Sequence, residues 1–272
     1  HDWEFAFQGQ SSEDVRANVA EGQFGIWEET GFYINLALLI GAYGGLGYGE
    51  SIGAMVQQDG LLVPEEEELS EAVAKGLSKE ARYEDGQRAA AALDLRSAMQ
   101  KFGIEPGFIE IKHRHKEFGL QASAFRMGVP FTGHPMFGHD IIYTHPLNTG
   151  AAIGRTAERD FLSFAKSVSK LEGGVYLSVG SAVMSPMIFE KSLSMARNLA
   201  LQEDRRIEDF SIYVVDLSPL TWDWSTGKEP PQDNPAYYLR FLKTFNRMGG
   251  RMSYVSADNR DFLVALHRLL AQ

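Results

Sequence analysis

In the C-terminal part of the chain, segments with a strand-like pattern of apolar residues alternate with segments that have a helical pattern. Short apolar runs typical of buried strands are separated by segments whose apolar residues recur with helical spacing. The predicted strands cover residues 108–112, 130–133, 175–179, 210–216 and 251–255. The predicted helices cover residues 158–171, 186–199, 236–247 and 260–270. This alternation favours an α/β fold with a Rossmann-like parallel sheet and helices on both faces.

Helical patterns prevail in the N-terminal half. One helix is predicted from the glutamates at residues 65–68, which suit the positive end of a helix dipole, to about Leu77. A second covers residues 85–102. Gly47, Gly49 and Gly53 follow an apolar run and look like part of a dinucleotide-binding fingerprint. Because the third glycine comes late and no clear strand precedes them, we favour close packing of helices.

Charge and composition exclude several classes of function. The net charge of −10 argues against a nucleic-acid-binding surface and is compatible with cationic substrates such as polyamines. The chain has no cysteine, and therefore no disulfide or thiolate nucleophile. Its longest uncharged run, residues 31–49, contains Asn35 and several glycines and is too weakly apolar to span a membrane. We expect no nucleic acid, no membrane partner and a cytoplasmic location.

Lys243 is the strongest candidate for covalent chemistry. Asn234 can cap a helix and Pro235 suits its first turn, so the lysine is expected on a short amphipathic helix. Arg240 and Arg247 fall three residues before it and four after it, on the same face. Two guanidiniums and partial burial would disfavour the ammonium form and leave more free amine for imine chemistry. The same spacing also fits a surface lysine on a helix whose aromatic residues pack inward.

Polar residues follow several predicted strands at their carboxyl ends, where parallel sheets bind ligands. They are His134, Gly180 with Ser181, Asp216 and Asp258. The turn at Gly180 leads from a strand into a new helix, and the free amides of such a helix suit a phosphate or a carboxylate. An ordinary strand-to-helix turn fits the same residues equally well.

Five of the seven histidines fall between His113 and His145, with Asp140 among them. Such a cluster raises the question of a metal site. Lysine and arginine residues surround His113 and His115, which disfavours a bound cation, so we predict no metal site. His139 and His145 suit binding of an amine or proton transfer with it.

The order and spacing of several segments resemble deoxyhypusine synthases. Phe-Leu-Lys at residues 241–243 resembles the family's Trp-Gly-Lys segment, and Tyr254 follows at the distance of its Tyr-Ala-Asp strand, with Asp258 after it. Further resemblances to the family's segments lie at residues 1–4, 128–134, 138–145 and 173–181. A bacterial deoxyhypusine synthase-like branch shares four short motifs, which begin at His1, Ser12, Phe24 and Gly180.

This resemblance implies a reaction and a set of site residues. NAD would oxidise an amine of polyamine type to an imine, Lys243 would capture the imine, and the carbon chain would pass to a second amine. The implied substrate-binding residues are Asp140, His139, His145, Tyr237 and Phe241. The implied NAD-binding residues are Gly180, Ser181, His134 and Asp258. Tyr237 and Phe241 stand where the family has a polyamine-binding glutamate and a tryptophan. The family also implies a homo-oligomer.

Two other functions fit the same sequence. One is a sugar-phosphate or nucleotide enzyme that uses the Gly180 turn without NAD chemistry. The other is a non-catalytic ligand-binding protein. We expect a single α/β domain over residues 1–272, and, because the chain begins with histidine inside a motif, we expect an N-terminal segment to be missing.

Overall fold

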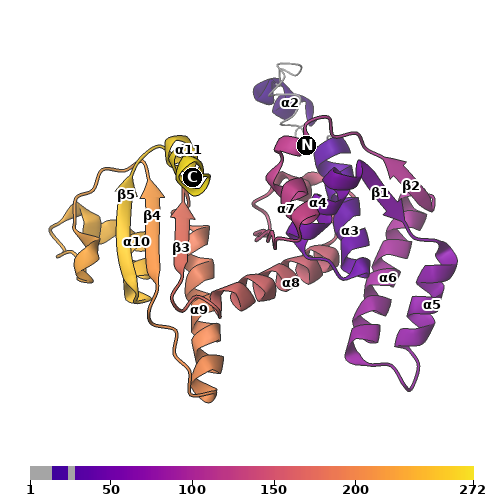
Figure 1. Ribbon diagram of the computed structural model, residues 1–272. Helices are drawn as coiled ribbons and strands as arrows, with labels where there is room; N and C mark the ends of the chain where they lie inside the picture. Colours follow the sequence, from indigo (N-terminus) through magenta and orange to yellow (C-terminus); the bar gives the residue numbers. More distant parts are fainter. Residues whose placement is uncertain (1–13, 24–27) are drawn as a thin grey trace. The chain divides into compact units, whose positions relative to one another are not determined.

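The computed structural model describes residues 14–23 and 28–272 (Figure 1). The contacts within the chain divide it into two compact units, His1–Phe161 and Leu162–Gln272. The single domain over residues 1–272 stays a prediction. The motifs that begin at His1, Ser12 and Phe24 lie wholly or partly outside the described residues.

The first unit is mainly helical. A two-stranded antiparallel sheet joins β1 (Gly60–Val63) to β2 (Gly107–Glu110). The helices are α2 (Val15–Glu21), α3 (Ile34–Gly44), α4 (Tyr48–Gln58), α5 (Glu66–Gly76), α6 (Tyr83–Phe102), α7 (Leu120–Met127) and the start of α8 (Gly150–Val168). Shorter turns are η1 (Glu28–Tyr33), η2 (Lys116–Phe118) and η3 (Ile141–Thr144).

Helix α3 lies at the centre of this unit. Its sequence is apolar on nearly all sides, and Leu36, Leu38 and Leu39 are fully buried, as expected of a helix surrounded by protein. Asn35 is its buried polar residue. The Asn35 side chain donates to the carbonyls of Gly31 at 2.7 Å and Ile142 at 3.0 Å, so it ties the segment after α7 to the core helix.

Two predicted strands differ from the structure. The strand expected at residues 108–112 exists as β2, but it pairs with β1 and not with the parallel sheet. Residues 130–133 form no strand. Pro130 has no amide hydrogen to donate to a neighbouring strand. The Gly133 amide donates to the carboxylate of Asp160 at 2.6 Å instead, so these residues do not pair with a sheet.

The second unit confirms the α/β class and the parallel sheet. Its strands are β3 (Val175–Val179), β4 (Ser211–Asp216) and β5 (Arg251–Ser256), in the order β3-β4-β5. Its helices are α9 (Met184–Gln202), α10 (Arg240–Arg247) and α11 (Asn259–Leu270), with the turns η4 (Trp224–Thr226) and η5 (Pro235–Tyr238). Both strand pairs are parallel.

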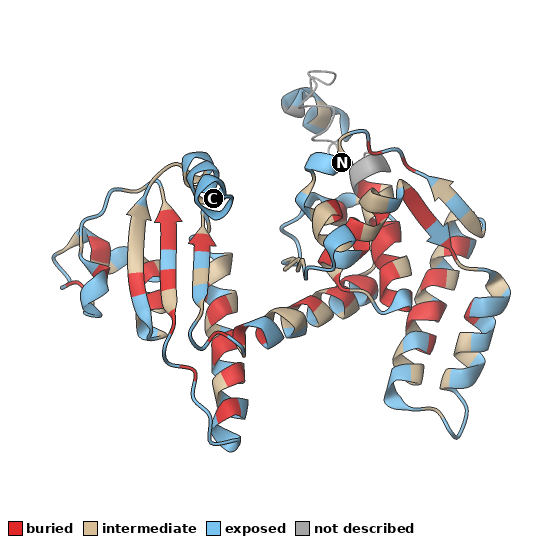
Figure 2. Ribbon diagram, viewed as in Figure 1, coloured by how far each residue is buried: buried red, intermediate tan, exposed pale blue. Residues whose placement is uncertain are grey.

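One face of this sheet carries the core of the unit. Ile212 and Val214 of β4 are buried together with Phe189 of α9 and Phe245 of α10. Figure 2 shows buried positions, in red, along β4 and α9. The alternate residues of the strands point to the other face, where Val175, Leu177 and Tyr213 are exposed. The sequence predicted helices on both faces of the sheet. Helices cover only part of this second face.

Candidate functional site

The carboxyl edge of the parallel sheet brings several of the expected residues together. The register pairs Val179 with Val215 and Val215 with Val255, so the three strands end side by side. The Gly180 amide donates to the Val215 carbonyl at 3.0 Å, and the Ala257 amide donates to the Asp216 carbonyl at 3.0 Å. Residue 258 follows directly, and its edge position agrees with the sequence prediction.

The Gly180 turn is closed on the side that faces α11. Gly180 has a φ of +67°, and a Cβ atom at this residue would lie 2.3 Å from Nδ2 of Asn259. A dinucleotide-binding turn needs open space at such a glycine, because the pyrophosphate approaches the backbone there. The end of the Asn259 side chain fills this space, so the pyrophosphate of NAD could approach Gly180 from this side only after Asn259 moves.

The other two residues expected to contact NAD on this edge have internal partners. The Ser181 hydroxyl oxygen accepts from the Ser185 amide at 3.0 Å, at the start of α9. Asp258 caps α11, because its carboxylate accepts from the Arg260 amide at 2.8 Å. The side-chain hydrogen bond from Arg260 lowers the pKa of Asp258. Both side chains thus stabilise helix starts.

A partly buried chain of hydroxyl groups connects β3 to α9. The Ser185 hydroxyl lies 2.8 Å from the Tyr176 hydroxyl and 2.8 Å from the Ser178 hydroxyl. Burial raises the pKa of Tyr176, so its phenol stays protonated and available as a donor. These groups satisfy one another and fix the first turn of α9 to the sheet.

Asp216 lies at the end of β4 among a second set of hydroxyl groups. One Asp216 carboxylate oxygen accepts from the Ser218 amide at 2.9 Å. The Ser218 carbonyl accepts from the Tyr254 hydroxyl at 2.9 Å and from the Ser256 hydroxyl at 3.0 Å. Burial, and then the charge of Asp216, raises the pKa of Tyr254. Asp216 is the acidic group at this edge that suits a hydroxyl-bearing ligand or a proton transfer.

Lys243 lies against the segment before α10. Its ammonium nitrogen is 3.7 Å from the ring centroid of Tyr237, and the side chain is half-buried. Arg247 forms a two-bond ion pair with Glu229, at 2.5 and 3.0 Å, and its hydrogen bond lowers the pKa of Glu229. Glu229 therefore balances the charge of Arg247. The sequence had predicted two guanidiniums without a partner beside Lys243, and Arg247 is not one of them. Phe241 packs partly against the core.

Four of the expected site residues belong to the first unit. Asp140 and His139 are exposed. His145 is half-buried against Gly31, and its Nδ1 atom accepts from the Leu147 amide at 3.1 Å. The imidazole of His145 therefore has a structural role in holding the segment after η3.

His134 and two tyrosines lie in the same unit. The Thr132 hydroxyl is 3.0 Å from Nε2 of His134, and burial lowers the pKa of that imidazole. Burial, and then the charge of Asp140, raises the pKa values of Tyr48 and Tyr143. The Tyr143 hydroxyl is buried and has no hydrogen-bond partner among the described residues. His134 thus belongs to the first unit, and the strand predicted before it does not form.

The expected residues therefore form two sets. Lys243 and Tyr237 touch each other, and Gly180, Ser181 and Asp258 gather at the carboxyl edge of the second unit. Asp140, His134, His139 and His145 belong to the first unit.

Asp160 is a buried acid that the sequence analysis missed. Its Oδ2 atom accepts from the amides of Gly49 at 2.7 Å and Gly133 at 2.6 Å, and only 2% of the residue is exposed. A Cβ atom at Gly47 would lie 1.7 Å from its Oδ1 atom. Burial raises the pKa of Asp160. The glycines near Tyr48 thus pack closely, as we favoured, and an internal carboxylate occupies the start of α4.

The described residues contain no cluster typical of a metal site. Within residues 14–23 and 28–272, no three or more His, Cys, Asp or Glu side chains gather as ligands for a metal ion. None of the helices in this part of the chain combines the length and apolar character needed to cross a membrane. Comparison with known proteins finds no matching family model, no matching curated protein and no matching solved structure.

Proposed function

We propose that the protein is a transferase that acts on amines or carbonyl compounds through an imine on Lys243. The observation that supports this proposal is the setting of Lys243. Its half-buried amine lies on the face of Tyr237 and forms no ion pair with any described residue, whereas Arg247 beside it is paired with Glu229. The amine is thus held in place without a carboxylate that would bind it permanently.

The proposed reaction needs a substrate with an electrophilic carbon. The Lys243 nitrogen, after losing its proton, attacks a carbonyl or imine carbon, and water or an amine leaves as the new imine forms. A second amine then attacks the same carbon and releases Lys243.

The resemblance to deoxyhypusine synthases also implies NAD, which would supply the oxidation of an amine to an imine. At the Gly180 turn, the side chain of Asn259 fills the space beside the glycine and would have to move before the pyrophosphate of NAD could approach it. No step of the proposed reaction is assigned to NAD. The substrate that this reaction requires is therefore an aldehyde, a ketone or a preformed imine.

Reductive trapping tests this proposal. With 4-aminobutanal as the probe, borohydride should convert the imine on Lys243 into a stable secondary amine, found by peptide mass spectrometry. Lys243→Ala should lose this adduct, and Lys228→Ala, at an exposed lysine close to Tyr237 in sequence, should retain it. Equal labelling of the exposed lysines, or an adduct yield that Lys243→Ala leaves unchanged, would remove the support for imine chemistry.

A second candidate function rests on the start of α9. The backbone amides of residues 181–183 have no acceptor among the described residues, and they lie on the same sheet edge as Asp216. These are features of an enzyme that binds a phosphate-bearing substrate and uses an acid for proton transfer.

This second candidate predicts that inorganic phosphate binds at the carboxyl edge. A titration followed by amide NMR should shift the signals of residues 181–183 saturably. The signal of Gly86, in the other unit, should stay unchanged. Shifts that grow without saturation, or that affect all amides equally, would contradict a phosphate site at α9.

A further inference from the structure

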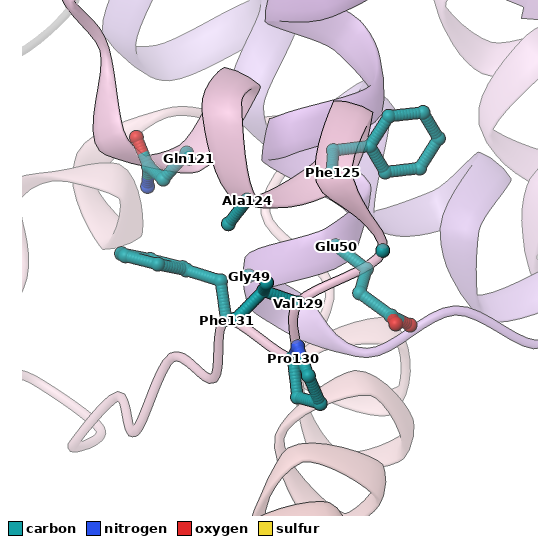
Figure 3. Close-up of a pocket in the computed structure, with 9 residues that line it drawn as sticks. Gly49, Glu50, Gln121, Ala124, Phe125, Val129, Pro130 and Phe131 are labelled. Carbon is teal, nitrogen blue, oxygen red and sulfur yellow. The ribbon is translucent and has the colours of Figure 1, made fainter.

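The first unit contains a cavity that neither proposed function uses (Figure 3). It has a volume of about 250 Å³ and lies between the start of α4, helix α7 and the segment that follows α7. This volume is below the range typical of sites for drug-sized ligands, so a molecule of only a few heavy atoms suits it. The residues that line it are Gly49, Glu50, Gln121, Ala124, Phe125, Gly128, Val129, Pro130 and Phe131.

Glycines fix the walls of this cavity. At Gly53 of α4, a Cβ atom would lie 2.8 Å from the Gln121 carbonyl of α7. At Gly49, a Cβ atom would lie 2.0 Å from the Phe131 carbonyl. The two helices and the segment after α7 therefore touch at these points, and the cavity is the space left between them. The space is open to solvent on one side, since Glu50, Gly128, Val129 and Pro130 of its lining are exposed.

The lining is apolar with two polar groups. Phe125, Val129 and Phe131 supply apolar surface, and the side chains of Glu50 and Gln121 lie on different sides of the cavity in Figure 3. One Glu50 carboxylate oxygen accepts from the Gly47 amide at the long distance of 3.3 Å. Glu50 forms no ion pair and the Gln121 side chain forms no hydrogen bond with any described residue.

We propose that this cavity binds a small organic cation, with its alkyl part between Phe125, Val129 and Phe131 and its ammonium group at Glu50. Glu50 is the charged residue of the lining, and a carboxylate forms strong charge-assisted hydrogen bonds with an ammonium group. An anionic ligand of the same size would meet the charge of Glu50 and be repelled.

This inference is independent of Lys243, which belongs to the other unit. A failure to trap an imine on Lys243 would leave it unchanged. Conversely, binding of a cation at Glu50 would not establish transferase activity. The two proposals are therefore tested by separate residues and separate measurements.

An NMR titration of the full chain with butylammonium chloride tests the proposal. The signals of Gln121 and Ala124 should shift saturably, with a dissociation constant on the order of millimolar for so small a ligand. Ammonium chloride at equal ionic strength, 1-butanol and sodium butyrate serve as comparators. Each should bind more weakly than butylammonium, because each lacks either the alkyl part or the positive charge.

Three variants locate the site. Glu50→Gln should weaken butylammonium binding roughly five- to tenfold, because a neutral amide replaces a carboxylate. It keeps an acceptor for the Gly47 amide. Glu117→Gln removes one exposed charge from the same unit and should change nothing. Ala124→Leu should fill the cavity and abolish binding.

The comparison of Glu50→Gln with Glu117→Gln decides the outcome even if Ala124→Leu does not fold. Equal binding of butylammonium and butyrate would overturn the proposal. So would equal affinities in the wild type and Glu50→Gln, or the absence of saturable shifts in the wild type. A selective loss of affinity in Glu50→Gln supports a cation site in this cavity.

Discussion

Replacing Asp160 by alanine is expected to lower the free energy of unfolding of the first unit by about 2–5 kcal/mol. The carboxylate is buried, and one of its oxygens accepts from both the Gly49 and the Gly133 amides. Its loss leaves two buried donors without an acceptor, and each such donor costs about 1–3 kcal/mol. It also leaves a space beside Gly47. Urea denaturation followed by circular dichroism, together with hydrogen exchange of the α4 amides, measures the loss.

Asp160→Asn separates the hydrogen bonds from the charge. The asparagine oxygen can accept from both amides, so this variant should recover part of the stability lost in Asp160→Ala. Glu71→Gln, at an exposed residue of α5, removes one negative charge without removing a buried partner and should leave stability within about 0.5 kcal/mol. If Asp160→Ala behaved like Glu71→Gln, the internal cap at α4 would contribute nothing to stability.

The stability of the wild type should also depend on the ionisation of Asp160. Burial raises the pKa of this carboxyl above the ordinary value of 3.8, so the folded state binds the proton more tightly than the unfolded chain does. Its contribution to stability is therefore largest below 3.8 and falls as pH rises from 3.8 through the raised value. The advantage of the wild type over Asp160→Asn should shrink over that interval. An advantage that grew with pH would show that the amides of Gly49 and Gly133 favour the charged form.

Local patterns predicted most of the secondary structure of the second unit. Strands β3, β4 and β5 and helices α9 and α11 lie close to the predicted ranges, because short apolar runs and helical periodicity are local signals. The partner of β2 was not predictable in this way. Strand β1 is only Gly60–Val63, and its antiparallel pairing with β2 joins residues that are far apart in the chain.

The candidate site was predicted less well than the fold, because its chemistry depends on distances between segments. The spacing of α10 placed Arg247 near Lys243, but the ion pair of Arg247 with Glu229, eighteen residues earlier, has no local signal. Likewise, the sequence around Gly180 does not show that the side chain of Asn259, from another helix, lies beside this glycine. Asp160 had one local signal, an acidic residue within an amphipathic helix, which did not reveal its distant partners.

Gly49→Ala is expected to destabilise the first unit by about 1–3 kcal/mol, the usual cost of excess volume in a packed interior. The new Cβ would lie 2.0 Å from the Phe131 carbonyl oxygen, which is backbone and cannot rotate away. Moving this segment would strain the hydrogen bond from Gly133 to Asp160. Gly86→Ala is the matched control: its Cβ meets nothing within 4 Å in helix α6, so it should stabilise by about 0.5–1 kcal/mol.

A double variant tests whether Gly49 and Asp160 act as one structural element. Gly49→Ala with Asp160→Ala should cost clearly less than the sum of the two single changes, because both disturb the same contact between α4 and the segment of Gly133. Additive costs, measured by the same urea denaturation, would show that the close approach at Gly49 and the buried carboxylate stabilise the unit independently.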